Sequence, residues 1–286
     1  NQLARAQRGA MTYGFSVLIL TKNEEADLPG CLKSIDGVDD IWVLDSISED
    51  NTVQIANAFG AHVVAREFDG FAAQRNHALR NFGFRHEWLL ILDADERPSP
   101  ELLDELRRFA SDAPDEIGAA RMRRRDYFLG RWLKHAQISP YFIRFVRPSR
   151  VHYEREVNEV LIVDGEIHEL AGPLDHFPFS KGMAHWIGKH NVYSSMEAGE
   201  LLRRRQADFS ITKALFARDF NVRRFHQKAL FYRMPCRPVF KFFYMMAVRR
   251  SFLDGRAGWH YTFLQCVYEY LISVKAVELQ RSDGRR

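Results

Sequence analysis

Short apolar runs alternate with longer amphipathic segments through the N-terminal part of the chain. Four runs have the length and composition of buried strands, at 15–20 (FSVLIL), 41–44 (IWVL), 62–65 and 88–92 (WLLIL). The segments between the runs predict helices, over 25–35, 51–59 and 71–82. Short buried strands that alternate with helices of about ten residues predict a parallel sheet with crossover helices.

Capping residues support this α/β interpretation independently of hydrophobicity. Ser99-Pro100-Glu101 opens a further helix, with Ser99 as the N-cap and Pro100 at the first helical position. Gly60 follows the helix predicted over 51–59, at the place where a C-terminal cap is expected.

The pattern changes further along the chain. Residues 126–180 are mixed and loop-rich, and the pattern after them is helical. Residues 1–10 precede Met11 and carry no apolar period, so we interpret them as a leader or a tag. We therefore expect an α/β domain over 11–202 and a helical C-terminal region over 203–286.

The net charge of +4 hides an asymmetry between these two parts. Residues 1–202 hold 23 Lys and Arg against 31 Asp and Glu, a net of −8, whereas residues 203–286 hold 18 against 6, a net of +12. Basic surfaces attract phosphate, whether on lipid or on nucleic acid. The longest run without a charged residue, 51–65, has 15 residues and contains Asn, Gln, Thr and His, so the sequence predicts no membrane-spanning helix.

Composition excludes several other classes of protein. Apolar residues make up 46% of the chain and charged residues 27%, which is a globular balance rather than that of a disordered, collagen-like or coiled-coil chain. The three cysteines, Cys31, Cys236 and Cys266, are an odd count and form no CxxC pair. A disulfide scaffold and a cysteine zinc site are therefore disfavoured, and a reducing compartment fits better.

Polar residues follow three of the predicted strands directly. The first strand ends in TKNEE (21–25), the second in DS (45–46) and the fourth in DADE (93–96). In open parallel sheets, ligands bind outside the carboxyl ends of the strands. We therefore expect these three distant segments to converge on one crevice.

The Asp93-Ala94-Asp95 triplet is the first candidate for a metal site. Two carboxylates that are two residues apart around a turn can both reach one hard cation. Mg²⁺ or Mn²⁺ held in this way keeps bound waters and takes up phosphate oxygens of a substrate. The alternative is an acidic turn that is simply solvated, but the position after a strand of five apolar residues favours the site.

Two further side chains have both a binding and a structural interpretation. Asp45 could accept the imide N–H of uracil or thymine, or it could cap the helix predicted over 51–59. Arg75 near a helix N-terminus would offer its charge and the helix dipole to an anion, or it could be a solvated helical arginine.

Taken together, these residues resemble a family 2 inverting glycosyltransferase of GT-A fold. The resemblance runs through seven segments: SVLILTKNEE (16–25), VLDSISEDNT (43–52), FDGFAAQRNHAL (68–79), WLLILDADERPSPEL (88–102), FLGRWLKH (128–135), VHYEREVNEVL (151–161) and RRSFLDGRAGWHYTFL (249–264). It covers nearly the whole chain after Met11. The closest subgroup resembles the bacterial lipooligosaccharide glucosyltransferases, which add β-linked hexose to the inner core of lipopolysaccharide.

The resemblance implies a nucleotide-sugar donor, usually linked to UDP, and a divalent metal, Mg²⁺ or Mn²⁺, bound through the DxD. It places three residues at the nucleotide pocket: Thr21, Asn23 and Glu24. It also places Asp45 at the base and Arg75 beside the base or the diphosphate.

For the ribose and the metal, the resemblance implies Asp93 and Asp95. His176, in the sequence LDHF, is a candidate to complete the metal shell or to contact phosphate, although a lone histidine more often packs or forms a structural hydrogen bond.

Two positions depart from the family pattern. The loop after Asp45 has Ile47 where the family usually has Gly, and a β-branched residue resists the positive φ that Gly permits. Asn158 stands in VNE where the subgroup usually shows His, so a contact made there would use an amide in place of an imidazole.

Inverting transfer needs a carboxylate to take the proton of the acceptor hydroxyl. The candidates are Glu159, in the matching VNE tripeptide, and then Glu154. The structural alternative for each is a surface ion pair, since Arg155 lies next to Glu154. No covalent intermediate is needed, so we expect no Ser or Cys nucleophile.

The basic region over 203–286 predicts a peripheral attachment to the anionic inner leaflet of the cytoplasmic membrane, where a lipid-linked saccharide acceptor would lie. Its aromatic residues could instead pack on the α/β part. We expect no nucleic-acid partner, because an acidic crevice repels phosphate and no recognised binding motif is present.

Other classes remain as alternatives. A polyprenyl-phosphate glycosyltransferase would use the same residues, and a basic nucleic-acid- or membrane-binding protein without catalysis would explain the C-terminal region. A nucleotidyltransferase would usually carry a Gly-rich loop after its first strand, where this chain reads TKNEE (21–25).

Overall fold

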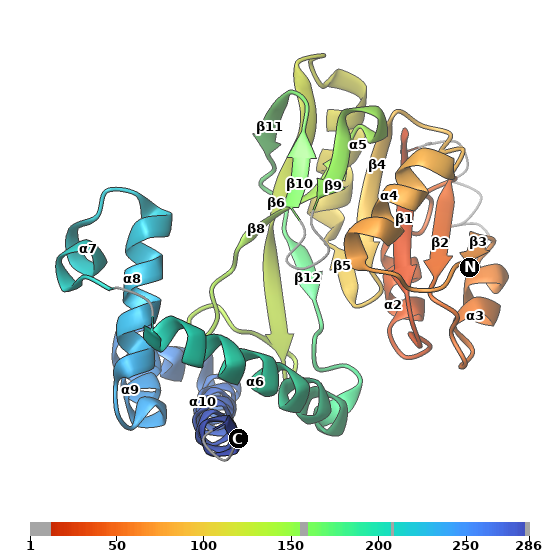
Figure 1. Ribbon diagram of the computed structural model, residues 1–286. Helices are drawn as coiled ribbons and strands as arrows, with labels where there is room; N and C mark the ends of the chain where they lie inside the picture. The colour runs from red at the N-terminus through yellow and green to blue at the C-terminus, as the bar shows by residue number, and fades with distance from the viewer. Residues whose placement is uncertain (1–12, 155–159, 207–208, 284–286) are drawn as a thin grey trace. The chain divides into compact units, whose positions relative to one another are not determined.

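The computed structural model describes three stretches of the chain: 13–154, 160–206 and 209–283. The chain forms two compact units: Asn1–Tyr127 with Ser139–Ser180, and Phe128–Ile138 with Lys181–Arg286. The first unit holds the sheet, and the second is helical apart from β7 (Arg131–Trp132) (Figure 1). The boundary that we expected at 202 falls inside α6 (Gly182–Gln206).

Four strands form the parallel half of the sheet, in the order β3-β2-β1-β4. They are β1 (Phe15–Thr21), β2 (Ile41–Asp45), β3 (His62–Ala65) and β4 (Trp88–Asp93). Three helices connect them: α2 (Leu28–Ser34), α3 (Thr52–Ala58) and α4 (Phe71–Asn81). The pattern of the sequence predicted all seven elements. The largest difference is at α2, which begins at Leu28 because Pro29 favours the first helical turn.

Beyond β4 the sheet continues in the order β8-β6-β12-β5 and becomes mixed. The strands are β5 (Glu96–Pro98), β6 (Ile117–Phe128), β8 (Tyr141–Val146) and β12 (Leu174–His176). The other elements of this unit are α5 (Pro100–Asp112), η1 (Pro148–Arg150), β9 (Val151–Glu154), β10 (Val160–Val163) and β11 (Glu166–Glu169). Because β5 follows β4 after two residues and pairs with β12, the end of β4 lies close to β12.

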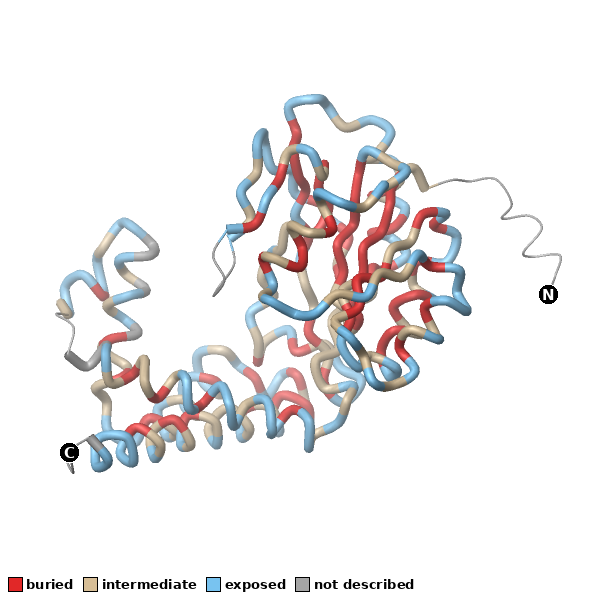
Figure 2. The backbone as a smooth tube through the Cα atoms, turned by 45° about the vertical axis from the view of Figure 1, so that its right-hand side comes forward, coloured by how far each residue is buried: buried red, intermediate tan, exposed pale blue. Residues whose placement is uncertain are grey.

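The core of this unit lies on both faces of the central strands. Strands β1 and β4 are buried along almost their whole length, as Figure 2 shows. On one face the ring of Trp88 stacks on Phe145 at 4.9 Å, and on the other Leu18 and Leu89 pack with Ala78 of α4. Each fully buried large apolar side chain contributes about 1.5–3 kcal/mol, so the strand ends are held on a rigid support.

Both predicted caps are present. The Ser99 hydroxyl accepts a hydrogen bond of 3.2 Å from the backbone N–H of Leu102, and Pro100 stands at the start of α5. Gly60 has a φ of +81°, the left-handed conformation that ends a helix at little cost for glycine.

The second unit is built from α6 and six further segments: α7 (Ile211–Phe216), α8 (Phe220–Arg233), α9 (Arg237–Phe243), η2 (Tyr244–Val248), η3 (Ser251–Asp254) and α10 (Gly255–Asp283). Its small core joins three helices through Leu201, Tyr232 and Ile272. Within the described stretches, none of the helices combines the length and the apolar content that crossing a bilayer requires.

Candidate active site

The carboxyl ends of β1, β2 and β4 lie next to one another at one edge of the sheet. Thr21 pairs in register with Asp45, and Leu20 pairs with Asp93. The polar segments that follow these three strands in the sequence therefore converge, as the parallel arrangement predicted.

Asp45 is buried and is occupied by its own loop. One carboxylate oxygen accepts hydrogen bonds from the hydroxyls of Thr21 (2.7 Å) and Ser48 (2.6 Å). The other accepts from the backbone N–H of Ser48 at 2.7 Å. These contacts hold the turn after β2, so a contact with a nucleobase would have to share an oxygen that already serves the turn.

The turn after β2 is tied to the end of β1 by Asn23. Its side-chain oxygen accepts from the N–H of Glu49, and its backbone N–H donates to the hydroxyl of Ser48, both at 2.8 Å. The next residue, Glu24, donates its N–H to the Thr52 hydroxyl at 2.7 Å. Two of the three expected nucleotide-pocket residues thus shape this edge through their backbone and amide groups.

Ile47, the first departure from the family pattern, takes the conformation that Gly would take. Its φ is +60°, in the left-handed region that a β-branched residue resists. The Lys22 ammonium donates to the carbonyl of Ile47, which helps to hold this turn in place.

Asp93 lies between two guanidinium groups. Arg75 of α4 donates to one of its oxygens at 3.1 Å, and Arg144 of β8 donates to the other at 2.6 Å. Burial opposes the charged carboxylate, but Arg144 and then Arg75 outweigh it and hold the pKa of Asp93 well below its usual range.

Glu96 belongs to the same network as Asp93 and Arg144. It is fully buried, accepts from the backbone N–H of Asp93 at 3.0 Å, and receives Arg144 at 2.8 Å. Burial raises the pKa of Glu96, an effect that the charge of Arg144 opposes and the charge of Asp93 reinforces. The pKa of Arg144 is raised in turn by these two carboxylates, against its own burial.

Asp95 meets His176, which the topology brings from 81 positions further along the chain. The Nε2 atom of His176 lies 3.3 Å from an Asp95 carboxylate oxygen, while its Nδ1 atom is hydrogen-bonded to the buried carboxylate of Asp126. Burial lowers the pKa of His176, but the hydrogen bonds with Asp126 and Asp95 outweigh it and raise the pKa to about 9.

This arrangement has the form in which proteins present a histidine to a metal, because a carboxylate on Nδ1 fixes the ring and aims Nε2 outward. Among the described residues, no group of three or more His, Cys, Asp and Glu side chains is arranged to hold a metal by itself. Asp95 and His176 would supply two ligand atoms, and the oxygens of water and substrate would have to supply the rest. Asp93, with both oxygens on arginines, is the weaker ligand.

The match to a protein-family model decides the class of this site. The model of "Glycosyl transferase family 2" matches residues 16–165, more than half of the chain, and that range includes β1, β2 and β4 with their polar ends. The chain belongs to glycosyl transferase family 2. The enzyme class and the GT-A type α/β fold that the sequence predicted are thereby confirmed.

Similar proteins include glycosyltransferases of bacteria. An uncharacterized glycosyltransferase of Rickettsia typhi is 28% identical over 229 residues, covering 73% of this chain and 77% of the relative. The lipopolysaccharide core biosynthesis glycosyltransferase LpsC of Rhizobium meliloti is 28% identical over 195 residues, covering 65% and 70%.

One solved structure with a related sequence is glucosyl-3-phosphoglycerate synthase of Mycobacterium tuberculosis, determined with Mn²⁺, UDP and glucosyl-3-phosphoglycerate. It is 28% identical to this chain, with a TM-score of 0.34, over 42% of this chain and 46% of that one.

Of the two candidates for the catalytic base, Glu154 lies within the described residues and Glu159 does not. Asn158 also lies outside the described residues. Glu154 ends β9 with an exposed side chain, 3.2 Å from the imidazole of His152. Its neighbour Tyr153 places its ring 5.4 Å from the guanidinium of Arg75. Strand β9 therefore borders the site at Asp93 through Tyr153, and the exposed side chain of Glu154, the next residue, lies on the other face of the strand.

The sequence pattern did not single out two residues of this site, Asp126 and Arg144, and it included Glu96 only as the last residue of the polar segment DADE (93–96). Arg144 had a local signal, since it is a charged residue inside the apolar strand YFIRFV (141–146). Asp126 had none, because only the pairing of β12 with β6 sets it opposite His176.

Proposed function

We propose that this glycosyltransferase moves a hexose, with inversion, from a UDP-sugar to a saccharide or glycolipid acceptor of the lipopolysaccharide inner-core type. The observation that carries the proposal is the pair Asp95 and His176, oriented by Asp126, beside an Asp93 held by two arginines at the edge of a family 2 sheet. The likeness to LpsC supports the class of acceptor.

On the donor side, the residues offer complementary charges. Asp95 and His176 would hold a divalent cation, which when bound offsets the negative charge that builds up on the leaving diphosphate. A mixed oxygen and nitrogen donor pair suits Mn²⁺ better than Mg²⁺, which strongly prefers oxygen. Arg75 lies at the same edge, is buried, and would orient the diphosphate or the base.

The reaction itself is a single displacement. The acceptor oxygen forms a bond to the anomeric carbon while the bond from that carbon to the β-phosphate oxygen breaks, and UDP leaves with the electron pair. The hydroxyl proton passes to a carboxylate, for which we propose Glu159, with Glu154 as the alternative. The position of β9 beside Arg75 supports a base from this part of the chain.

We further propose that the enzyme works at the cytoplasmic face of the inner membrane. The net charge of +12 over residues 203–286 supports attachment to an anionic leaflet, because each nearby Lys or Arg contributes about 1 kcal/mol. The segment from α9 to η3 supports it too, since Phe243, Val248 and Arg250 are all exposed there.

The experiment is a transfer assay with a panel of UDP-hexoses and a core oligosaccharide acceptor, with Mn²⁺, Mg²⁺ or a chelator. We expect transfer that the chelator abolishes and that Asp95→Ala lowers by about 10²–10³-fold, while the exposed control Asp104→Ala stays at the wild-type rate. Transfer that is unchanged in Asp95→Ala, or unaffected by the chelator, would contradict the metal assignment.

The same assay separates the two bases. Glu159→Gln should lower turnover by about 10²–10⁴-fold while UDP binding persists, and Glu154→Gln should have a smaller effect. The reverse order would move the base to Glu154.

A further inference from the structure

Helix α10 exposes a narrow apolar stripe along most of its length. Its six members follow spacings of four and three residues, and each is between 44% and 60% exposed. We call this stripe the α10 seam: Trp259, Phe263, Val267, Tyr270, Val274 and Val277. Such spacing keeps the side chains on one side of a helix, in the pattern by which two helices pack against each other.

The opposite side of α10 already has its partner within the unit. Ile272 and Ala276 are buried in the small core with Leu201 of α6, and the Lys275 ammonium donates to Ser194 and Ser195 of α6 at 2.8 Å. At its N-terminal end the seam is contacted within the unit by Phe242 of α9, whose ring centroid lies 6.3 Å from that of Trp259 and 5.7 Å from that of Phe263. All six members of the seam nevertheless stay between 44% and 60% exposed. Apolar surface of this extent on one helix marks an interaction site.

The residues that flank the seam favour a protein partner over a lipid surface. An in-plane lipid-binding helix carries Lys and Arg along its polar border, whereas the described part of α10 has no exposed cation between Arg256 and Arg281. His260 and Ser273 lie on the two sides of the seam, with Glu278 near its end. The seam is also narrower than the broad apolar face of a lipid-embedded helix.

We propose that two copies of the chain associate through the α10 seam, packed antiparallel about a two-fold axis. In this order Trp259 of one copy faces Val277 of the other, Phe263 faces Val274, and Tyr270 faces Val267. Every layer then sets an aromatic ring against a valine, which packs without large voids. In parallel order each residue would face itself, so three layers would pair two aromatic rings and three would pair two valines.

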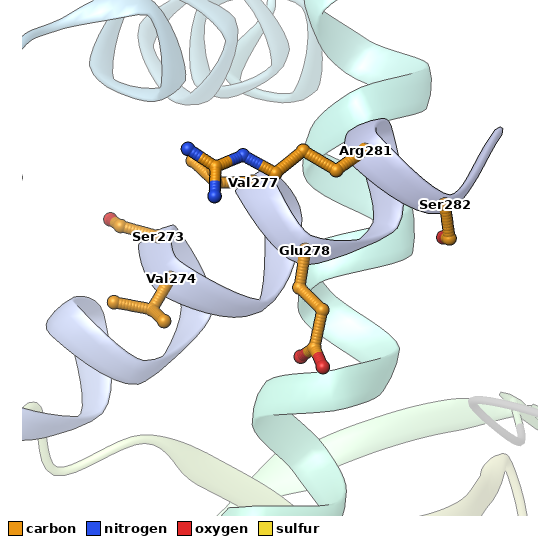
Figure 3. A pocket seen from close by; sticks show the side chains of 6 residues that line it. All are labelled: Ser273, Val274, Val277, Glu278, Arg281 and Ser282. Atoms are coloured by element: carbon orange, nitrogen blue, oxygen red, sulfur yellow. The ribbon is translucent and has the colours of Figure 1, made fainter. Parts of the chain in front are cut away.

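A hollow at the C-terminal end of the seam fits this arrangement. It has a volume of about 680 Å³, and the described residues that line it are six residues of α10: Ser273, Val274, Val277, Glu278, Arg281 and Ser282 (Figure 3). The antiparallel order brings the indole of Trp259 from the second copy to this hollow. A two-fold interface is self-complementary, so the same fit occurs twice.

The apolar area of the seam is at the lower limit for a specific dimer. The exposed fractions leave on the order of 500 Å² of apolar surface on each seam. Pairing would thus bury on the order of 1,000 Å² in total, the size at which a biological interface begins.

The first test is the mass in solution by light scattering. We expect twice the 33.4 kDa of one chain, and Tyr270→Glu should weaken the dimer roughly thirtyfold or more, as for a central interface aromatic. The matched control is Phe216→Glu on α7, which is more exposed and lies outside the seam. A monomer at all concentrations, or a dimer that survives Tyr270→Glu, would overturn the proposal, as would a monomer whose seam binds lipid vesicles.

The second test fixes the orientation by cross-linking with a short bis-maleimide, in a background where Cys236 and Cys266 are replaced by Ser. Val267→Cys should cross-link to itself, because it lies near the two-fold axis. Val277→Cys should not, since its two copies are about 25 Å apart along the helix axis. A mixture of Val277→Cys with Trp259→Cys should cross-link.

Self-linking of Val277→Cys would instead show parallel packing and contradict the proposed order. Unfolding temperature and UDP binding of each variant establish that it is folded. Because dimer mass is measured without a transfer assay, failure of the proposed reaction and failure of this interface remain distinguishable.

Discussion

The two units differ in the size of the ionic network that they bury and in the apolar surface that they leave exposed. At the end of β4, the first unit packs Arg75, Asp93, Glu96 and Arg144 into one largely desolvated network. The second unit has a buried ion pair, Arg237 with Glu269, and leaves many large apolar side chains exposed. Burying charges and exposing apolar groups both disfavour the folded chain.

The difference suggests where each unit meets its ligands. A buried ionic network keeps charged groups in fixed positions, which is what recognition of a diphosphate and its counter-ion requires. Exposed apolar surface is stabilised only when something covers it, which is what association requires. The difference therefore suggests that the reaction takes place at the sheet edge of the first unit, and that the helices of the second unit bind large partners.

The largest expected effect comes from removing the cation at the centre of the first network. Arg144→Met should lower the free energy of unfolding by about 3–5 kcal/mol, because it removes the nearest cation from the buried Glu96 and leaves it with Arg124, at 3.9 Å. It should also weaken UDP binding. Urea unfolding and calorimetric titration with UDP measure the two effects.

The matched change in the second unit is Arg237→Met, which removes the nearest cation from the buried Glu269 and leaves it with Lys241, at 4.0 Å. It should destabilise by a similar amount, yet leave UDP affinity unchanged in protein that is still folded. Equal losses of UDP affinity in the two variants would break the contrast between the units.

The sequence predicted the parts of the first unit that depend on local pattern. Strand runs, the Ser99 cap and the polar strand ends are encoded within a few neighbouring residues, and a parallel sheet then forces the ends to converge. The partners of these groups come from elsewhere. Arg144 reaches Asp93 only because β8 pairs antiparallel with β4, and no local pattern specifies that pairing.

The second unit was less predictable for a different reason. Its helices were expected, but an apolar position in a helix can face a core, a membrane or a second chain. Only the packing of α6 on one side of α10 shows that Trp259 and Tyr270 are left outside. The boundary that we expected at 202 falls inside α6, because a change of composition along the chain does not mark where a helix begins or ends.

A smaller effect is expected from the carboxylate that orients His176. Asp126→Asn removes the negative charge of the carboxylate that faces Nδ1 of His176, while the asparagine side chain keeps the shape of the aspartate. Loss of such an orienting partner typically lowers metal affinity by about 10–100-fold. Titration of Mn²⁺ into the protein in the presence of UDP measures it.

The control for this variant is Asp175→Asn, since Asp175 precedes His176 but pairs with Arg125 instead, at 2.6 Å. It should leave the Mn²⁺ affinity within twofold or so of the wild type. Similar losses in both variants would show that charge near β12 matters and orientation does not.

The smallest expected effect concerns a strained turn in each unit. Ile47 in the first unit and Arg250 in the second have φ values of +60° and +57°. Left-handed backbone costs a non-glycine residue about 1–2 kcal/mol, which glycine avoids. Part of this gain is lost, because the unfolded chain is more flexible at a glycine. Ile47→Gly and Arg250→Gly should therefore each raise the free energy of unfolding by about 0.5–1 kcal/mol, measured by urea titration.

Ile47→Ala is the control, because it removes the half-exposed side chain but keeps the Cβ that causes the strain. It should leave stability unchanged or slightly lower, so a gain equal to that of glycine would mean that the side chain, not the backbone, is unfavourable. The contrast between the units then predicts a further difference. Ile47 lies in the turn that Asp45 and Lys22 hold at the sheet edge, so loosening it should weaken UDP binding, whereas Arg250→Gly should leave UDP binding as it was.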